Sequence, residues 1–327
     1  MDFKKDHIRL LQDDWTKVSR LMDSVLQSDI RLLNEANGHI LSHNGKMIRP
    51  AMSLLFARAC GESVSDNGRK VAAAAELLHN ATLLHDDVAD CSEERRGVPT
   101  TSSILGDRAS VLLGDYWLVK AMELILDCGP YSDRVTRIFA KTLSDLASGE
   151  MLQLQKAVLG DTSREDYLRI IYSKTASLFE ASCVSAAICA GASETLVEAA
   201  RKYGVSTGIA FQIKDDILDY SATDALGKPV GMDLREKKIT LPLLGALQRV
   251  SDEEGREVRR MVCGIDAHPE YYEQIRAFVF REEGIAYAGS VLEEYVARAK
   301  EALRAFPAGE AVELLSSLAD FIGERQS

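Results

Sequence analysis

Two groups of aspartates with the same spacing are the residues that could do chemistry in this chain. They are Asp86, Asp87 and Asp90, and then Asp215, Asp216 and Asp219. On a helix the first and last aspartate of each group share a face. Clustered carboxylates repel one another unless a cation lies between them, and all-oxygen ligation suits Mg²⁺ completed by a substrate's phosphates. The repeated pattern therefore predicts a metal site that takes a diphosphate.

Each aspartate group follows an apolar, helix-patterned run, residues 77–85 and residues 209–213. A single acidic cluster is more often solvated surface, but neither of these runs is polar enough for a solvated face. If the two helices face each other across a bundle, six aspartates frame one cavity. Filled with Mg²⁺, such a cavity attracts a diphosphate. This arrangement can remove a diphosphate leaving group from carbon.

Composition narrows the class of protein. The 327 residues are 46% hydrophobic, which indicates a folded globular protein, and only seven prolines favour long helices. A net charge of −11 argues against nucleic acid as a partner. Six scattered cysteines without a CxxC pair are expected to be reduced thiols of a cytoplasmic protein. We expect neither a signal peptide nor a membrane-spanning segment.

The elements that must position these residues are helices, because helical periodicity dominates and strand alternation is nearly absent. We expect one all-α domain over residues 1–327, a bundle of long helices around a central cavity. Helices are predicted at residues 5–36, 46–60, 66–90, 108–128, 131–158, 163–191, 194–220, 239–250, 252–263, 269–282, 284–305 and 309–323. Their predicted N-caps include Ser65, Thr162 or Ser163, and Ser251. Residues 91–107 and 221–238 are predicted loops at the cavity mouth.

Cationic side chains near the two aspartate groups could bind phosphate, although each alone is more often surface. Arg95 and Arg96 follow the first group, and Lys228 and Lys238 follow the second. Further cations are Lys46 and Arg49 at a predicted helix start, and Lys174, which precedes Thr175 in a largely apolar helix. Their joint presence around two aspartate groups favours a functional interpretation.

His79 lies two helical turns before Asp86 on the same face. With Glu76 it also matches the Glu-x-x-His motif of di-iron bundles. That alternative needs a second such motif, and the chain has none. We therefore set the di-iron interpretation aside.

From about residue 40 onward the chain resembles the trans-type polyprenyl diphosphate synthases of the long-chain type. The segments that carry the resemblance stand in the family's order: GKMIRP at 45–50, LHDDVAD at 84–90, RRG at 95–97, GEMLQL at 149–154, KTA at 174–176 and FQIKDDILDY at 211–220. The resemblance implies an isoprenoid synthase fold. It also implies a prenyltransferase that condenses isopentenyl diphosphate with an allylic prenyl diphosphate.

The resemblance assigns roles to individual residues. All six aspartates would hold Mg²⁺, three ions, on the allylic diphosphate, which Arg95, Lys174, Lys228 and Lys238 would also contact. Lys46, Arg49, His79 and Arg96 would hold the diphosphate of isopentenyl diphosphate, and Thr175 and Gln212 would lie near the ionising carbon. Lys237 stands where the family often has glycine, which leaves open whether Lys237 or Lys238 faces the site. We also expect a homodimer that forms through the helices of residues 108–158, from the family resemblance, and a transient membrane contact during product release.

Product length depends on what lies below the first aspartates. Ala81 is about 7.5 Å down the helix from Asp86, and Thr82 about 6 Å. Short-chain members of the family typically place Phe or Tyr at this level. This chain has Ala81 and Thr82 here, then Leu78, and further from Asp86 along the helix the small residues Ala72–Ala75. An open tunnel would give a long all-trans product, a quinone side-chain precursor. The alanines could instead serve close helix packing. If the tunnel is open, Trp117 and Met122 are candidates for its floor.

Other functions remain as alternatives. A short-chain farnesyl or geranylgeranyl diphosphate synthase would use the same chemistry, as would the catalytic subunit of a two-component synthase. A terpene cyclase shares the fold, but the second aspartate group and the Lys46/Arg49 pair argue against it. A non-catalytic partner subunit would typically lack the aspartates.

Overall fold

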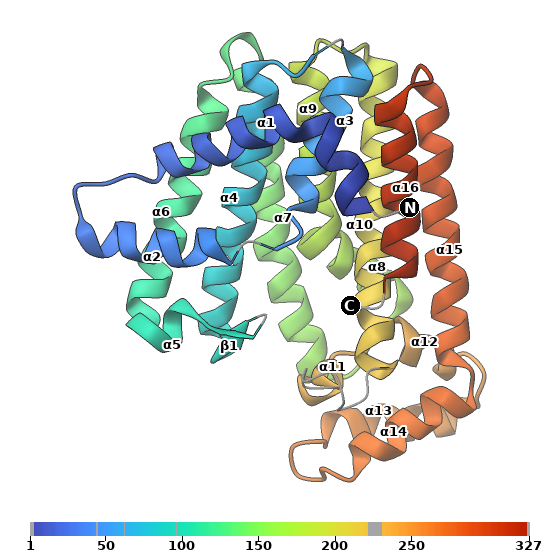
Figure 1. Ribbon diagram of the computed structural model, residues 1–327. Coiled ribbons are helices and arrows are strands. Elements are labelled where there is room, and N and C mark those ends of the chain that lie inside the picture. Colours follow the sequence, from blue (N-terminus) through green and yellow to red (C-terminus); the bar gives the residue numbers. More distant parts are fainter. Residues whose placement is uncertain (1–2, 44, 62, 96, 222–230, 326–327) are drawn as a thin grey trace. The chain divides into compact units, whose positions relative to one another are not determined.

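The computed structural model describes residues 3–43, 45–61, 63–95, 97–221 and 231–325. These residues are mostly helical (Figure 1), which confirms the predicted all-α class. The one sheet among them is an antiparallel hairpin of β1 (Glu94–Arg95) and β2 (Val98–Pro99). All six cysteines are free thiols. No helix in the described ranges is long and apolar enough to cross a membrane.

The chain divides into two compact units. The first contains Met1–Ala140, Ala181–Arg201 and Ala305–Leu315, and the second contains Lys141–Glu180, Lys202–Arg304 and Ser316–Ser327. Four helices have residues in both units: α7 (Ser132–Leu159), α9 (Ser177–Cys189), α10 (Glu194–Ser221) and α16 (Glu310–Glu324). The single domain over residues 1–327 stays a prediction.

The first unit is built around α4 (Asp66–Ala89), the helix that carries the first aspartate group. Ser65 caps its N-terminus by accepting the N–H of Gly68. All of Ala72–Ala75 is fully buried, and the helix packs against α1 (Phe3–Val25), α3 (Ile48–Cys60), α5 (Thr101–Leu105) and α6 (Asp107–Leu126). A short 3-10 turn, η1 (Gly129–Tyr131), follows α6. Small side chains at consecutive positions let α4 contact neighbours on several sides.

The predicted helix 5–36 is wrong in one respect, because the chain breaks between α1 and α2 (Arg31–Ser42). At the break, side-chain amides form hydrogen bonds with backbone groups that would otherwise be bonded within a helix. Asn34 accepts the N–H of Ser28 and donates to its carbonyl, and Asn37 donates to the carbonyl of Leu26. Such local bonds satisfy the backbone without a helix.

The predicted loop 91–107 also differs, since it contains the β1–β2 hairpin and α5. Thr100 caps α5 by accepting the N–H of Ser103. Of the predicted loop 221–238, residues 222–230 lie outside the described part of the chain. Its last residues form the short helix α11 (Met232–Arg235).

The second unit carries the other aspartate group on α10. Its further elements are α8 (Arg164–Ile171), the π-helical turn η2 (Tyr172–Ala176), α12 (Leu241–Leu247), α13 (Asp252–Cys263), α14 (Tyr271–Arg281), α15 (Gly284–Ala302) and the 3-10 turn η4 (Leu303–Ala305). Ser163 and Asp166 form a reciprocal capping box at the start of α8, and Ser251 caps α13. The predicted N-caps at Ser65, Ser163 and Ser251 are thus confirmed.

The backbones of α10 and of η2–α9 lie unusually close within this unit. A Cβ at Gly204 would lie 2.8 Å from Glu180 Cα, and one at Gly208 would overlap Ala176. The two glycines are one turn apart, and Gln212 is one turn further on the same face. Their lack of side chains therefore brings the Gln212 side of α10 close to the π-helical turn.

Candidate active site

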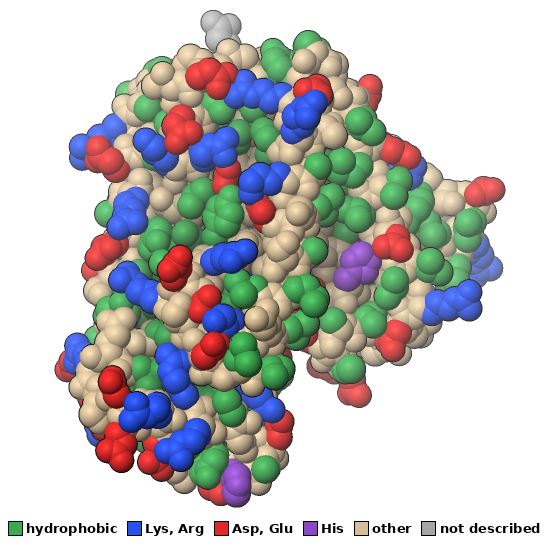
Figure 2. Space-filling model, turned by 180° about the vertical axis from the view of Figure 1, so that it is seen from behind, with side chains coloured by type: hydrophobic (Ala, Val, Ile, Leu, Met, Phe, Trp, Pro, Cys, Tyr) green, Lys and Arg blue, Asp and Glu red, His purple; other side chains and the backbone are tan. Residues whose placement is uncertain are grey.

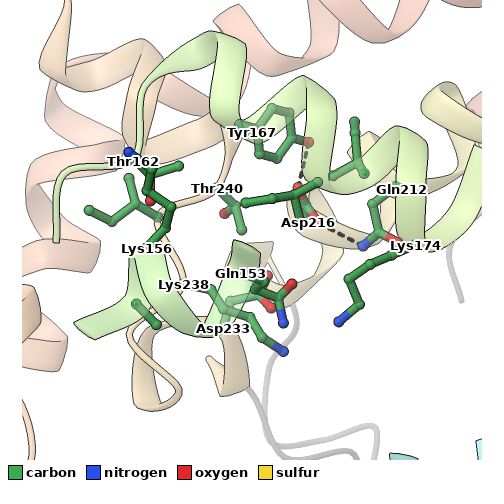
Figure 3. A pocket seen from close by; sticks show the side chains of 14 residues that line it. Gln153, Lys156, Thr162, Tyr167, Lys174, Gln212, Asp216, Asp233, Lys238 and Thr240 are labelled. Atoms are coloured by element: carbon green, nitrogen blue, oxygen red, sulfur yellow. Dashed lines mark hydrogen bonds between the residues drawn. The ribbon is translucent and has the colours of Figure 1, made fainter. Parts of the chain in front are cut away.

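A cavity of about 100 Å³ in the second unit brings together four residues predicted from the sequence (Figure 3). They are Lys174, Gln212, Asp216 and Lys238. The other polar residues of its wall are Gln153, Lys156, Thr162, Tyr167, Asp233 and Thr240. The side chains come from α7, α8, η2, α10 and α11 and from the segment that leads into α12.

Asp216 is the buried centre of this cavity wall, with 2% of its surface exposed. The hydroxyl of Tyr167 donates to Asp216 Oδ2 at 2.6 Å, and Gln212 Nε2 donates to Oδ1 at 2.9 Å, as Figure 3 shows. Burial raises the pKa of Asp216 to about 7, although both hydrogen bonds act in the opposite direction. The two donors fix both carboxylate oxygens.

The row of hydrogen bonds continues from Gln212 to Thr175, whose hydroxyl donates to Gln212 Oε1 at 2.8 Å. Thr175 and Lys174 belong to the π-helical turn η2, which interrupts the predicted helix 163–191. Such turns are common at functional sites. Lys174 makes an ion pair with Glu150 of α7. A buried, connected row thus links Thr175, Gln212, Asp216 and Tyr167.

Asp219 accepts hydrogen bonds from the backbone of the segment that begins at residue 231. Its Oδ1 accepts the N–H groups of Gly231 and Met232, and its Oδ2 accepts that of Asp233, each at 3.1 Å. Burial raises the pKa of Asp219, opposed by these three backbone donors. Burial also raises the pKa of Asp233 well above its usual range. Asp219 therefore anchors the start of α11.

Lys238 lines the cavity, whereas Lys237 does not. Lys238 pairs with Glu236, and Lys237 pairs with Asp266 at 2.5 Å. The backbone of Lys237 is left-handed, with φ at 58°. Of the two lysines, Lys238 is therefore the one beside Asp216 and Asp233.

Asp215 is partly accessible, with 42% of its side chain exposed. Arg325, which follows α16, donates from Nη2 to Asp215 Oδ1 at 2.7 Å. Lys214 lies next to Asp215 in the chain, and burial, followed by the charge of Arg325, lowers its pKa.

The first aspartate group lies in the first unit, at the end of α4. Asp87 is buried and accepts a hydrogen bond from Arg95 Nε at 2.7 Å. Asp86 is half-buried, and Asp90, the residue after the helix, is exposed. Asp87 and Arg95 line a second, smaller cavity of about 70 Å³, together with His39, His43 and Asn80.

The other predicted cations of the first unit lie near the start of α3. Lys46 is exposed and Arg49 is half-buried in the first turn. Met47, between them, has a left-handed backbone with φ at 47°, and such strain is often found at functional sites. His79 is half-buried on α4. Arg96 and Lys228 lie outside the described residues.

The residues expected to set product length lie in the first unit. Ala81 is 1% exposed, whereas Thr82 is half-buried and donates to the carbonyl of His79 at 2.8 Å. Trp117 is fully buried and donates from Nε1 to Asn37 at 2.8 Å, and Met122 is half-buried. Neither of the two cavities described above is lined by Ala81 or Thr82.

The carboxylates fit a hard cation by their chemistry, because every donor is an oxygen. Within the described ranges, no three Asp, Glu, His or Cys side chains converge as a ready metal site. Asp87, Asp216 and Asp219 each hold protein donors in buried or half-buried positions. Asp90 is exposed, and Asp86 and Asp215 are half-buried, as is Asp219, whose carboxylate accepts three backbone N–H groups.

Tyr167, Asp233 and Arg325 are among the residues at this site that were not anticipated from the sequence. Tyr167 stands seven residues before Lys174, in a stretch that reads as ordinary amphipathic helix. Asp233 lies five residues after Lys228 and could have been found as an acidic residue among lysines. Arg325 carries no local signal, since its partner Asp215 is far away in the chain.

Comparison with known proteins identifies the family. Residues 30–278 match the sequence profile of the polyprenyl synthetase family. The chain is 37% identical over 308 residues to the all-trans-nonaprenyl-diphosphate synthase (geranyl-diphosphate specific) of Rhodobacter capsulatus, covering 94% of this chain and 93% of the relative. It is 38% identical over 316 residues to the octaprenyl diphosphate synthase of Haemophilus influenzae, covering 96% and 95%.

A solved structure is similar along almost the whole chain. The polyprenyl synthase from Caulobacter crescentus, complexed with calcium and isoprenyl diphosphate, has a TM-score of 0.90 and 36% identity, covering 98% of each chain. The fold and the site define an all-α enzyme of the prenyltransferase class. The chain belongs to the polyprenyl synthetase family.

Proposed function

We propose that this protein condenses isopentenyl diphosphate with an allylic prenyl diphosphate and gives a long-chain all-trans polyprenyl diphosphate, a quinone side-chain precursor. The observation that carries the proposal is the cavity in which Lys174 and Lys238 lie beside the row Thr175–Gln212–Asp216. The similarity to a nonaprenyl and an octaprenyl diphosphate synthase supports the long product.

The allylic diphosphate is proposed to bind at both aspartate groups with Arg95, Lys174, Lys228 and Lys238. Mg²⁺, expected as three ions, would be held by Asp86, Asp90 and Asp215, with Asp87, Asp216 and Asp219 supporting them, and it would stabilise the charge of the departing diphosphate. Lys174 and Lys238 add positive charge near the same leaving group. The ion pairs that these lysines make with Glu150 and Glu236 hold their side chains near the cavity wall.

Thr175 and Gln212 are suited to stabilise the allylic carbocation that remains when the diphosphate leaves. Thr175 uses its proton in the bond to Gln212, and Gln212 uses one of its two amide hydrogens in the bond to Asp216. The oxygens of both side chains are the negative ends of dipoles, which stabilise a carbocation. The proton lost after condensation is proposed to go to the released diphosphate.

Isopentenyl diphosphate is proposed to bind at Lys46, Arg49, His79 and Arg96. Support comes from the strained Met47 between two of these cations and from the helix start beside them. We further propose a cytoplasmic homodimer that contacts a membrane transiently when the apolar product leaves. Exposed apolar residues on α6 and α7, such as Leu112, Val119 and Met151, support the dimer.

Product analysis of the purified chain alone tests the function. With Mg²⁺, farnesyl diphosphate and isopentenyl diphosphate, we expect products beyond geranylgeranyl by chromatography or mass spectrometry. Products that stop at four isoprene units would identify a short-chain synthase. Activity that requires a second protein would identify a subunit of a two-component synthase. Conversion of the allylic substrate without isopentenyl diphosphate would identify a cyclase and refute the proposal.

A further inference from the structure

Arg325 is an arginine built into the second unit beside the first aspartate of the second group. Its Nη2 donates to Asp215 Oδ1 at 2.7 Å and to the carbonyl oxygen of Phe211 at 2.8 Å. Its guanidinium lies over the Phe211 ring, 3.9 Å from the ring centroid. Phe211 and Asp215 are one helical turn apart on α10, so one guanidinium spans both residues.

The arginine is buried, whereas Asp215 is partly exposed. The side chain of Arg325 is 6% exposed and that of Asp215 is 42% exposed. Burying a guanidinium is costly unless it is paired, and here the carbonyl, the ring and the carboxylate share that role. Two of the three contacts are to Phe211, so Arg325 stays in place when the charge at Asp215 changes.

We propose that Arg325 is a resident counter-cation for Asp215, which weakens metal binding at this aspartate until a diphosphate has bound. The inference rests on the proposed function, because it assigns Asp215 to the metal site. Arg325 touches no substrate in this account. It is a positioning residue that acts through Asp215.

The direction of the effect follows from charge. Without substrate, a divalent cation at Asp215 would lie within about one helical turn of a fixed positive charge in a poorly screened position, which disfavours binding. An arriving diphosphate brings several negative charges, which outweigh the guanidinium charge. Metal and diphosphate should then bind cooperatively, since each favours the other.

The experiment titrates Mn²⁺ into the substrate-free full chain and follows unbound Mn²⁺ by electron paramagnetic resonance. Arg325→Gln should bind Mn²⁺ at least about fivefold more tightly than the unmodified chain, since the repulsion is removed. Arg325→Lys keeps a charge and should change affinity much less. A merely structural role for Arg325 predicts the opposite sign, because loss of its contacts would loosen Asp215.

A second series adds inorganic pyrophosphate. The ratio of Mn²⁺ affinity with and without pyrophosphate should be larger in the unmodified chain than in Arg325→Gln. The gain from Arg325→Gln should vanish in an Asp215→Asn background, which isolates this aspartate from the first group. Arg304→Gln removes an exposed arginine of the same unit and should leave Mn²⁺ affinity unchanged.

The outcomes separate the two proposals. Unchanged or weaker Mn²⁺ binding in Arg325→Gln, with pyrophosphate-dependent binding retained, would overturn the role of Arg325 alone. Absence of Mn²⁺ binding in every variant, even with pyrophosphate, would overturn the proposed metal site and this inference together. Circular dichroism of each variant checks that the helical fold is intact.

Discussion

At the scale of single residues, burial changes the protonation of Asp216. Its pKa is about 7 in the folded chain against an ordinary 3.8, because it is buried. Between these values the folded state keeps a proton that the unfolded state has released. The free energy of unfolding of the metal-free protein should therefore fall as pH rises from about 4 to about 7.

The difference between these two pKa values corresponds to about 4 kcal/mol as an upper limit. Urea denaturation in the presence of a chelator, at pH 4.5 and at pH 7.5, measures the change. The matched variant is Asp216→Asn, which should show a flatter dependence. A profile as steep as that of the unmodified chain would assign the effect to other groups.

Asp86 tests the metal proposal in the first unit. Asp86→Ala should lower turnover by at least about a hundredfold, the range for loss of one electrostatic stabiliser. The fold should survive, since removal of a clustered charge relieves repulsion. Steady-state kinetics with Mg²⁺ measures the loss. Asp66→Ala, at the exposed other end of the same helix, is the control and should keep normal turnover. Near-normal turnover of Asp86→Ala would contradict the assignment.

Of the residues that line the cavity, sequence reasoning singled out Asp216 and Lys174 because each carries charge in a largely apolar helix, and Lys238 because it follows an aspartate group. It missed Tyr167 and Arg325 for a physical reason. Tyr167 has an apolar ring and reads as core, and only its hydroxyl, 2.6 Å from Asp216, shows its role. Arg325 meets Asp215 through tertiary packing that no local spacing records.

At the scale of elements, α11 depends on one side chain. Asp219 accepts three backbone N–H groups at its start, and a free helix start leaves such donors unsatisfied. Asp219→Ala should speed amide hydrogen exchange of residues 232–238 and displace Lys238 from the cavity. Asp215→Ala is the matched control, since it makes none of these bonds. Equal protection in both variants would show that α11 is held by other contacts.

Helix α4 carries the prediction on product length. Ala81→Tyr should fill the space below Asp86 and shorten the product to three or four isoprene units, while the first condensation continues. Ala81 is 1% exposed, so overpacking is an alternative outcome that thermal denaturation would detect. Product chromatography beside the unmodified chain decides the question. A folded variant with an unchanged long product would show that the tail runs elsewhere.

Element boundaries were predictable where caps and periodicity agree, as at Ser65 and Ser163. The break before α2 was not, because Asn34 and Asn37 read as polar positions of a continuing helix. The π-helical turn was also missed. One extra residue in a helical turn leaves the apolar pattern of residues 163–191 almost unchanged, although it reorients Lys174 and Thr175.

At the scale of the whole molecule, assembly is the main prediction. Leu112, Val119 and Leu126 are each more than half exposed and recur every seven residues, so they share one face of α6. Figure 2 shows hydrophobic side chains gathered on the face seen from behind. Exposed apolar groups of this kind mark interaction surfaces.

Leu112→Glu combined with Val119→Glu should convert a dimer, of about twice 35.9 kDa, into a monomer. Light scattering after size-exclusion chromatography measures the mass. Leu32→Glu changes a similarly exposed residue on α2 and should leave the dimer intact. A dimeric double variant would place the interface elsewhere.

The close approach of α10 to the π-helical turn has a consequence for fidelity. A layer of side chains adjusts by rapid rotamer changes, but Gly204 and Gly208 have no rotamers. The backbones of Thr175 and Gln212 can then change their separation only when whole helices move. A carbocation reacts with the first nucleophile that reaches it. A direct contact between two backbones keeps the helices that carry Thr175 and Gln212 at one separation through every round of elongation.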